Sequence, residues 1–165
     1  MKGVFRHHQS TEIWAPLIFG QEQEKYHRLR HYSDIVVTAT PAKTPVIRAE
    51  WLHPGLHITA MGADAPDKQE LFPEAFAGAD LLACDRRSQC FRPGEFHHPL
   101  AAGIIREDAD IPEPGAFTSG ARSGRTRRDQ ITICDLTGVG VQDTEIALLA
   151  YRRAVDKGLG ISFES

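Results

Sequence analysis

Residues 57–70, HITAMGADAPDKQE, predict a strand that runs directly into an acidic loop. The β-rich run at residues 57–60 ends at Met61-Gly62, and Asp64 follows in a loop closed by Pro66. In open α/β sheets ligands collect outside the carboxyl ends of the strands, so an acid in this loop is placed to meet a substrate. Asp64 is therefore the first candidate for catalysis. The alternative is a plain turn, because Asp, Gly and Pro are common turn residues for backbone reasons alone.

Strands and helices alternate on both sides of this stretch. Apolar runs at residues 34–40 (DIVVTAT), 80–85 (DLLACD) and 131–136 (ITICDL) predict three more strands. Between them we expect a short helical turn at 48–52, a helix at 73–77 with Pro at its first position, two helical pieces within 86–103 broken near Pro93-Gly94, and a clear helix at 142–157. Residues 106–128 predict a long connection with at most one helical turn. The alternation favours an α/β fold whose parallel sheet is covered on both faces.

The last predicted helix has an unusual distribution of side chains. Its acidic start and basic end complement the helix dipole, and Gly158 stands at the position of a C-terminal cap. Its middle, residues 146–151, is apolar on nearly every side. A helix of this kind is buried on more than one face, so we expect another subunit, or a missing part of the chain, to cover it.

Size and charge narrow the classes of function. With 165 residues and a formal net charge of -3, the chain predicts one domain with no general attraction to nucleic acid or to an anionic membrane. The one basic cluster lies among Ser and Gly residues and indicates a solvated loop; it comprises Arg122, Arg125, Arg127 and Arg128. We therefore expect no nucleic-acid partner.

Cysteines, histidines and apolar runs give further expectations. Three widely spaced cysteines without a C-x-x-C motif indicate neither a disulfide framework nor a zinc ribbon; they are Cys84, Cys90 and Cys134. The pairs His7-His8 and His97-His98 have no acidic or thiol partner at ligand spacing, so no metal is expected. No window approaches the about 20 apolar residues of a membrane span. A soluble protein of the reducing cytoplasm, with no membrane partner, is the expectation.

Two more loops could hold a ligand. Residues 135–143 run from a strand through a glycine-rich turn into a helix, where backbone N–H groups can approach a ligand. A tight connection without a ligand explains this turn equally well. Thr38, Thr40 and Pro41-Ala42 offer hydroxyls and free N–H groups suited to a ribose or a carboxamide, although Thr is also common in strands. The sequence contains no G-x-S-x-G, P-loop or H-E-x-x-H motif.

Taken together, several ordered motifs resemble the carboxyl-terminal part of the ornithine cyclodeaminase and mu-crystallin family. They are DIVVTATPAKTPVIRAEWLHPGLHITAMGADAPDKQEL, DRRSQC, GEFHH, AAGII, GRTRRDQITICDLTGVGVQDTEIALLAYRRA and FES, between about residues 33 and 165. The nearest branch is that of the cyclodeaminase-like proteins of ectoine utilisation. The resemblance implies a partial Rossmann-like parallel sheet with flanking helices, NAD as cofactor, and a dimer. It also implies oxidation of an amino acid at Cα by NAD+, loss of ammonia, ring closure and return of the hydride, as from ornithine to proline.

The resemblance also assigns residues. Asp64 matches the catalytic aspartate, and Lys68 follows it in a structural or cofactor-facing position. The loop that lines the nicotinamide ribose matches Thr38, Thr40 and Pro41, and the turn beside the nicotinamide ring matches Gly138, Val139, Gly140 and Val141. The resemblance also implies that the substrate is a small amino acid.

The chain departs from the family in several places. The G-x-G-x-x turn for the pyrophosphate and the amino-terminal domain are absent, so residues 33–165 are interpreted as the second half of the NAD domain and residues 1–32 as a divergent remnant of the first half. Phe72 replaces a helix-capping Asp, and Pro99 and Pro114 fall where the family has helix interior. We expect a truncated enzyme with weak NAD binding or none. The alternative is a non-catalytic fragment that acts as a dimerisation or interaction module, with a homodimer as the expected assembly.

Overall fold

A computed structural model describes residues 33–161 and 163. Four parallel strands form one sheet in the order β1-β2-β4-β3. Their bounds are Ile35–Thr38 for β1, His57–Ala60 for β2, Leu81–Cys84 for β3 and Thr132–Asp135 for β4. Each lies inside a run from which a strand was predicted, and the α/β class with a partial Rossmann-like parallel sheet is confirmed. The predicted segments at 11–15, 21–31 and the rest of residues 1–32 lie outside the described residues.

The short helices also lie where the sequence places them. The 3-10 helix η1 spans Ala49–Trp51, and the α-helices are α2 (Pro73–Ala77), α3 (Arg87–Cys90), α4 (His97–Ala101) and α5 (Pro114–Thr118). Pro114 is the first residue of α5 and Pro99 lies in the first turn of α4. N–H groups there have no partner within the helix, so neither proline breaks a helical hydrogen bond. Phe72 caps α2 without a side-chain hydrogen bond, as the missing Asp predicts.

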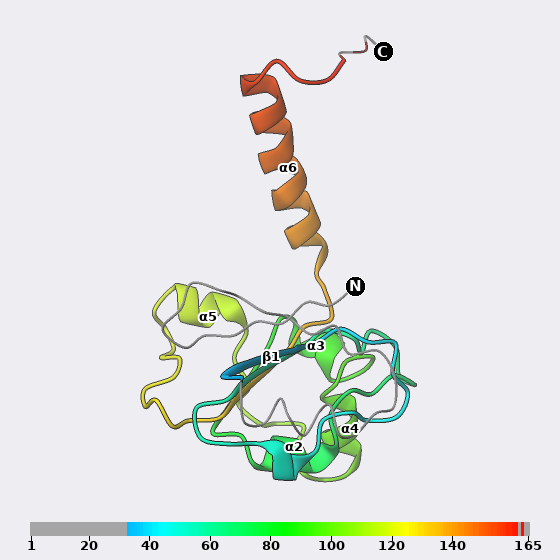
Figure 1. The fold of residues 1–165 in the computed structure, drawn as a ribbon, viewed down its shortest axis with the longest axis vertical. Helices are drawn as coiled ribbons and strands as arrows, with labels where there is room; N and C mark the ends of the chain where they lie inside the picture. Colours follow the sequence, from blue (N-terminus) through cyan, green and yellow to red (C-terminus); the bar gives the residue numbers. More distant parts are fainter. Residues whose placement is uncertain (1–32, 162, 164–165) are drawn as a thin grey trace.

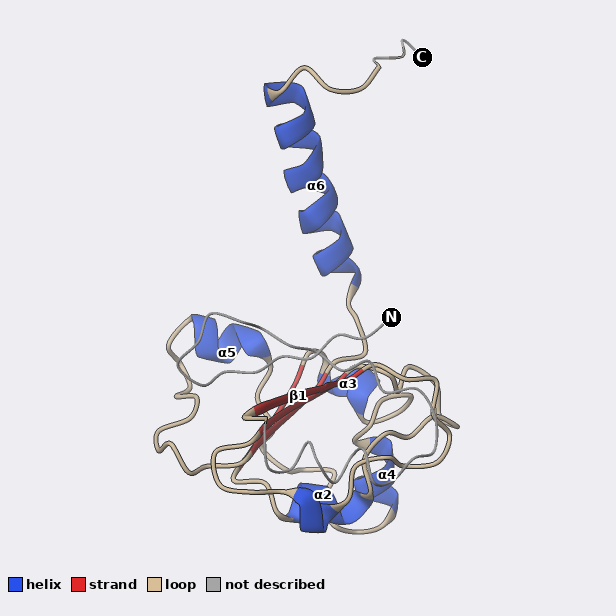
Figure 2. Cartoon of the chain, viewed as in Figure 1, coloured by secondary structure: helices blue, strands red, loops and turns tan. Residues whose placement is uncertain are grey.

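One face of the sheet carries the hydrophobic core. Ile58 of β2 and Ile133 of β4 are fully buried there, against Phe76 of α2 and Phe96 beside α4. Figure 2 shows α2 and α4 together on this side of the sheet and α5 on the other. Helices pack on this face because the apolar strand side chains that point to it must be buried.

The opposite face differs from the prediction that both faces are covered. Ile35 and Val37 of β1 point to it and remain 60% and 55% exposed. A hollow of about 820 Å³ lies over this face, with Phe117 of α5 on its lining. Arg125 lies in an exposed loop, as expected, and donates to the Thr132 hydroxyl at 3.0 Å, which anchors this loop to the sheet. Besides the strands and the loop residues Asp34 and Gly55, the lining of this hollow comes from α5 and the connection that follows it.

The long helix α6 (Gly140–Asp156) stands away from the body (Figure 1). It begins two residues earlier than predicted, so Gly140 and Val141 form its first turn. None of its residues is buried, and the side chain of Ile146 is 62% exposed. The expected burial on several faces is therefore not provided by the described residues. Among them, no helix combines the length and the apolar character that crossing a membrane requires.

Candidate active site at the carboxyl edge of the sheet

All three loops singled out from the sequence leave the same edge of the sheet. Hydrogen bonds continue the ladder past the strand ends: Met61 N donates to Thr38 O at 2.8 Å, and Leu136 N donates to Ala60 O at 2.8 Å. The loop after β1, the Asp64 loop after β2 and the glycine turn after β4 therefore start side by side. This is the edge at which parallel α/β sheets bind ligands.

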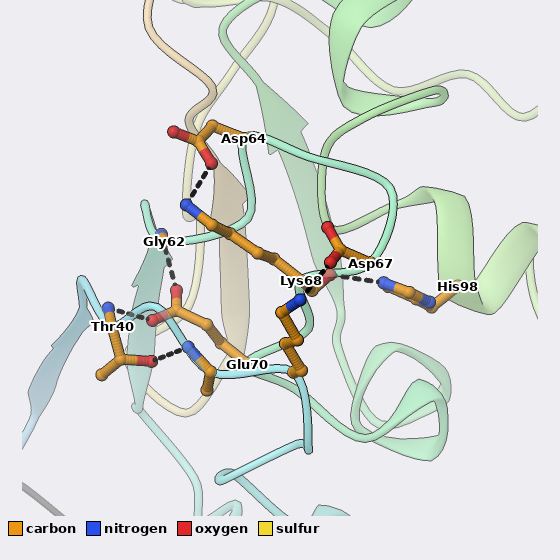
Figure 3. Close-up of polar contacts among 9 residues, drawn as sticks. Thr40, Gly62, Asp64, Asp67, Lys68, Glu70 and His98 are labelled. Atoms are coloured by element: carbon orange, nitrogen blue, oxygen red, sulfur yellow. Dashed lines mark hydrogen bonds and ion pairs between the residues drawn. The ribbon is translucent and has the colours of Figure 1, made fainter.

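Asp64 is exposed at this edge and paired with a lysine. Its side chain is 59% exposed, and Oδ1 accepts a hydrogen bond from Lys68 Nζ at 2.5 Å (Figure 3). The hydrogen bond and the charge of Lys68 lower the pKa of the Asp64 carboxyl below its usual value. The Lys68 carbonyl in turn accepts from Nε2 of His98 at 2.7 Å. The structure thus presents an ionised carboxylate to solvent and fixes the backbone of the lysine that holds it.

Glu70 lies directly beneath this loop and is completely buried. Its carboxylate accepts a hydrogen bond from Thr38 Oγ1 at 2.6 Å. It also accepts from Thr40 N at 2.6 Å and from Gly62 N at 2.7 Å (Figure 3). The N–H of Thr40 and the hydroxyl hydrogen of Thr38 are therefore already used, and the expectation of a free N–H is wrong for Thr40. The Thr38 oxygen keeps its capacity to accept a hydrogen bond.

Two more buried carboxyl groups, those of Glu95 and Asp135, accept hydrogen bonds from backbone N–H groups near Glu70. Glu95 accepts from the backbone N–H groups of Glu70 and Leu71, at 3.0 and 2.7 Å. Asp135 accepts from Phe96 N at 3.2 Å, and its Oδ1 has no hydrogen-bond partner among the described residues. Burial, with a smaller contribution from nearby carboxylates, raises the pKa of Glu95 to about 8 and that of Asp135 to about 7. The protonated forms are favoured because charge is costly in a buried site.

The glycine turn after β4 is also held by a buried carboxyl group, which comes from the end of the neighbouring strand β3. Asp85, which follows β3, accepts from Gly138 N at 2.7 Å and from Thr137 Oγ1 at 3.1 Å. Gly138 has φ +83°, a conformation that strongly favours glycine. Gln142 Oε1 accepts from Val139 N at 3.3 Å at the start of α6. The turn predicted from sequence is therefore fixed to the end of the neighbouring strand.

These four buried acids were not singled out as functional from the sequence. They are Glu70, Asp85, Glu95 and Asp135. A usable signal existed for Asp85 and Asp135, because each stands at the end of an apolar strand, in the kind of position that drew attention to Asp64. Among the described residues, no group of three His, Cys, Asp or Glu side chains is arranged to hold a metal ion.

Comparison with known proteins assigns this pattern to a family. The sequence pattern of the ornithine cyclodeaminase/mu-crystallin family matches residues 22–158. A cyclodeaminase of Sinorhizobium fredii, itself uncharacterised, is 53% identical over 131 residues, which cover 79% of this chain and 40% of that protein. The chain thus spans about 40% of the length of this relative.

Solved structures share the fold and bind a nicotinamide cofactor. The iminosuccinate reductase of Paracoccus denitrificans in complex with NAD+ superposes with a TM-score of 0.78 at 37% identity, over 85% of this chain and 42% of that one. An archaeal alanine dehydrogenase dimer with bound NAD gives 0.72 at 36% identity, over 79% and 41%. The pyrroline-2-carboxylate reductase of Thermococcus litoralis, in complex with NADH and L-proline, gives 0.75 at 26% identity, over 88% and 44%.

Proposed function

The chain belongs to the ornithine cyclodeaminase/mu-crystallin family, and on this premise we propose that it supplies the nicotinamide side of an NAD-dependent active site for an amino acid or cyclic imino acid. Family members include cyclodeaminases and reductases of imino acids. A diamino acid such as ornithine, and a role in ectoine utilisation, are the specific substrate and setting that we propose. Residues 33–165 would form the second half of the cofactor domain and residues 1–32 a remnant of the first. Three free thiols suit a reducing compartment, so we propose the cytoplasm as the location.

The observation that carries this proposal is the ionised carboxylate of Asp64 at the carboxyl edge of the sheet. A carboxylate whose pKa is lowered by Lys68 accepts a hydrogen bond from a substrate ammonium group. Once that group displaces Lys68, the carboxylate becomes more basic, so it can take a proton from the group and orient the resulting amine towards the substrate Cα. Lys68 keeps the acid charged until the substrate ammonium competes for it.

The surrounding loops fit the nicotinamide part of NAD. Thr38, Thr40 and Pro41 would hold the ribose, and the residues of the turn, Gly138, Val139, Gly140 and Val141, would lie beside the ring. At Gly138 and Gly140 an added Cβ would meet no atom within 4 Å, so a ligand can approach the backbone of the turn. When bound, NAD+ supplies a hydride acceptor for the substrate Cα.

Ligand-observed NMR with NAD+ tests the cofactor part of the proposal. On irradiation of the protein, the nicotinamide protons should receive more saturation than the adenine protons, because the described loops fit that end of the cofactor. Binding should be weak, since the sequence has no G-x-G-x-x turn for the pyrophosphate. Saturation of the adenine alone, or of neither ring, would contradict the assignment.

Ammonia release tests the catalytic part. The chain is incubated with NAD+ and either ornithine or a diamino acid of the ectoine pathway. Asp64→Asn should abolish release, whereas Asp67→Asn should retain it, because Asp67 is an equally exposed acid in the same loop that pairs with Lys43 instead. Absence of turnover in the unmutated chain would exclude activity of this chain by itself.

A second candidate function rests on α6 alone. A long helix with no buried residue and large apolar side chains, among them Ile146, Leu149 and Tyr151, is typical of an interaction element. Its acidic start and basic end would complement each other if two copies packed antiparallel, so a homodimer is the partner that we propose. Light scattering should then show a dimer that Ile146→Ser with Leu149→Ser dissociates. A monomer that binds no hydrophobic dye would argue strongly against this function.

A further inference from the structure

We propose that Glu70 is the positioning residue that holds the cofactor loop and the catalytic loop in a single arrangement, an inference that rests on the proposed function. The cofactor loop is residues 38–41 and the catalytic loop is residues 62–70. Glu70 receives two hydrogen bonds from the first, at Thr38 and Thr40, and one from the second, at Gly62. All three donors lie at the ends of the adjacent strands β1 and β2.

The side chain of Glu70 also closes the catalytic loop on itself. The bond from Gly62 N to Glu70 Oε2 joins the first residue of this loop to its last, and Asp64 and Lys68 pair within the ring so formed. The position of the Asp64 carboxylate relative to β1 is therefore set through Glu70. Without this closure the loop would keep its contacts on the carboxyl-terminal side, at the Lys68 carbonyl and the Gln69 N–H, but its Gly62 end would lose its hydrogen bond to Glu70.

Glu70 is itself held on both sides of its backbone. Its N–H donates to both oxygens of Glu95, at 3.0 and 3.1 Å, and its carbonyl accepts from Val46 N at 2.7 Å and Ile47 N at 3.0 Å. Because the backbone of Glu70 is fixed, its carboxylate has a defined position, and the hydrogen bonds to this carboxylate hold the two loops in place. This arrangement gives preorganisation, which catalytic groups need to within a fraction of an ångström.

Gly62 shows that the approach of the loops leaves no spare room. A Cβ at this position would lie 2.3 Å from Glu70 Oε1 and 2.3 Å from the Thr40 carbonyl oxygen. Only glycine lets the catalytic loop come close enough to donate its N–H to the carboxylate. Two loops and the acid between them are thus packed as one unit.

Charge is part of the arrangement as well as shape. An ionised carboxylate offers about four acceptor positions and can take all three hydrogen bonds, whereas a carboxamide has one acceptor oxygen and turns an NH2 group towards the remaining donors. Glu70→Gln therefore keeps the shape and breaks the contacts. Glu95→Gln is the matched control, because Glu95 is equally buried and touches neither Thr40 nor Gly62, and its Oε1 alone accepts from the N–H groups of Glu70 and Leu71, so a glutamine oxygen can keep both bonds.

The test measures amide hydrogen exchange and NAD+ contact in the same variants. In Glu70→Gln the amides of Thr40 and Gly62 should exchange faster by about tenfold or more, relative to the change in Glu95→Gln, because hydrogen bonds to a charged acceptor are lost. Saturation transfer to the nicotinamide protons should fall several-fold in Glu70→Gln and stay within about twofold in Glu95→Gln once both are folded. Thr38→Val, which removes one donor and keeps the carboxylate, should give a smaller loss, and Thr38→Ser should restore it.

The two readouts separate this inference from the proposed function. If the unmutated chain shows no nicotinamide contact, the proposed function fails, while the exchange rates still report on Glu70. If Thr40 and Gly62 exchange equally in Glu70→Gln and Glu95→Gln, the positioning role is wrong even when NAD+ binds. If Glu70→Gln does not fold, the comparison of Thr38→Val with Thr38→Ser decides, and equal exchange of the Gly62 amide in these two variants would overturn the inference, because Thr38 and Gly62 donate to the same Glu70 oxygen.

Discussion

Strand β4 and helix α6 are neighbours in the chain and opposites in their environment. Ile133 in β4 is 1% exposed and Ile146 in α6 is 62% exposed, although both are isoleucines in apolar runs. Only the turn that contains Gly138 separates the two elements. The candidate site lies at this boundary, where the packed body ends and the unpacked helix begins (Figure 1).

The contrast shows that an apolar composition predicts that a segment will be buried but does not predict which part of the protein will cover it. The core face of β4 is covered by helices that follow β2 and β3 in the same chain. Helix α6 has the same need, and no described residue meets it. Matched substitutions in the packed body and in α6 should therefore have different effects on stability.

Matched isoleucine substitutions should give the largest difference. Ile133→Ala removes a buried side chain from the core and should lower the free energy of unfolding by about 2–5 kcal/mol, because it leaves a cavity. Ile146→Ala should change it by less than about 0.5 kcal/mol, since an exposed side chain has little to lose. Urea unfolding measures both. A large loss of unfolding free energy in Ile146→Ala would show that α6 is packed in solution, and the expected difference between β4 and α6 would be wrong.

Matched glycine substitutions should give the next largest effect. Gly62→Ala forces a Cβ against Glu70 and the Thr40 carbonyl and should cost about 1–3 kcal/mol, as overpacking does. Gly140→Ala, in the first turn of α6, meets no atom within 4 Å and should be neutral or stabilise the helix by up to about 1 kcal/mol. Thermal unfolding of both variants provides the measurement. Equal midpoints would mean that the contact between the loops at Gly62 is loose.

Local patterns were sufficient to predict the elements of the fold. The run IVVT forms β1 because β-branched residues fit a half-buried strand, and Pro73 starts α2 because its fixed φ suits a first helical position. The sequence pattern also placed Asp64 in a loop after a strand. These predictions succeeded because each depends on neighbours a few residues away.

The contacts that complete the site could not be predicted in this way. Glu70 binds Thr38, which is 32 positions away, and its other partners are backbone N–H groups that leave no signature in the sequence. Glu95 likewise reaches Glu70 across 25 positions. The open face of the sheet was missed for a related reason, because apolar strands look the same whether or not a helix covers them.

Raised carboxyl pKa values give the body a pH dependence. Because burial raises the pKa of Asp135 to about 7 and of Glu95 to about 8, the folded chain binds more protons than the unfolded chain once the pH exceeds about 4. Stability should therefore fall as the pH rises from about 5 to about 8, by at most about 1.4 kcal/mol per pH unit for each proton. Urea unfolding across this range measures the slope.

Asp135→Asn should make this slope shallower, since the asparagine cannot ionise. The urea midpoint at the alkaline end of the range should then lie closer to the midpoint at the acidic end than it does in the unmutated chain. An unchanged slope would show that Asp135 is not the group that titrates. A slope of the opposite sign below about pH 6.5 would point instead to His57, because burial and Arg125 lower its pKa and a lowered histidine pKa makes stability rise with pH.

The smallest effect on stability is expected at Asp64 itself. Its partner Lys68 and its own carboxylate are accessible to water, and ion pairs of this kind contribute little to folding because solvent screens them. Asp64→Asn should therefore leave the urea midpoint unchanged, as should Asp67→Asn in the same loop. A clear loss in Asp64→Asn alone would mean that this acid serves the turn, whereas an unchanged midpoint together with lost ammonia release would leave catalysis as its role.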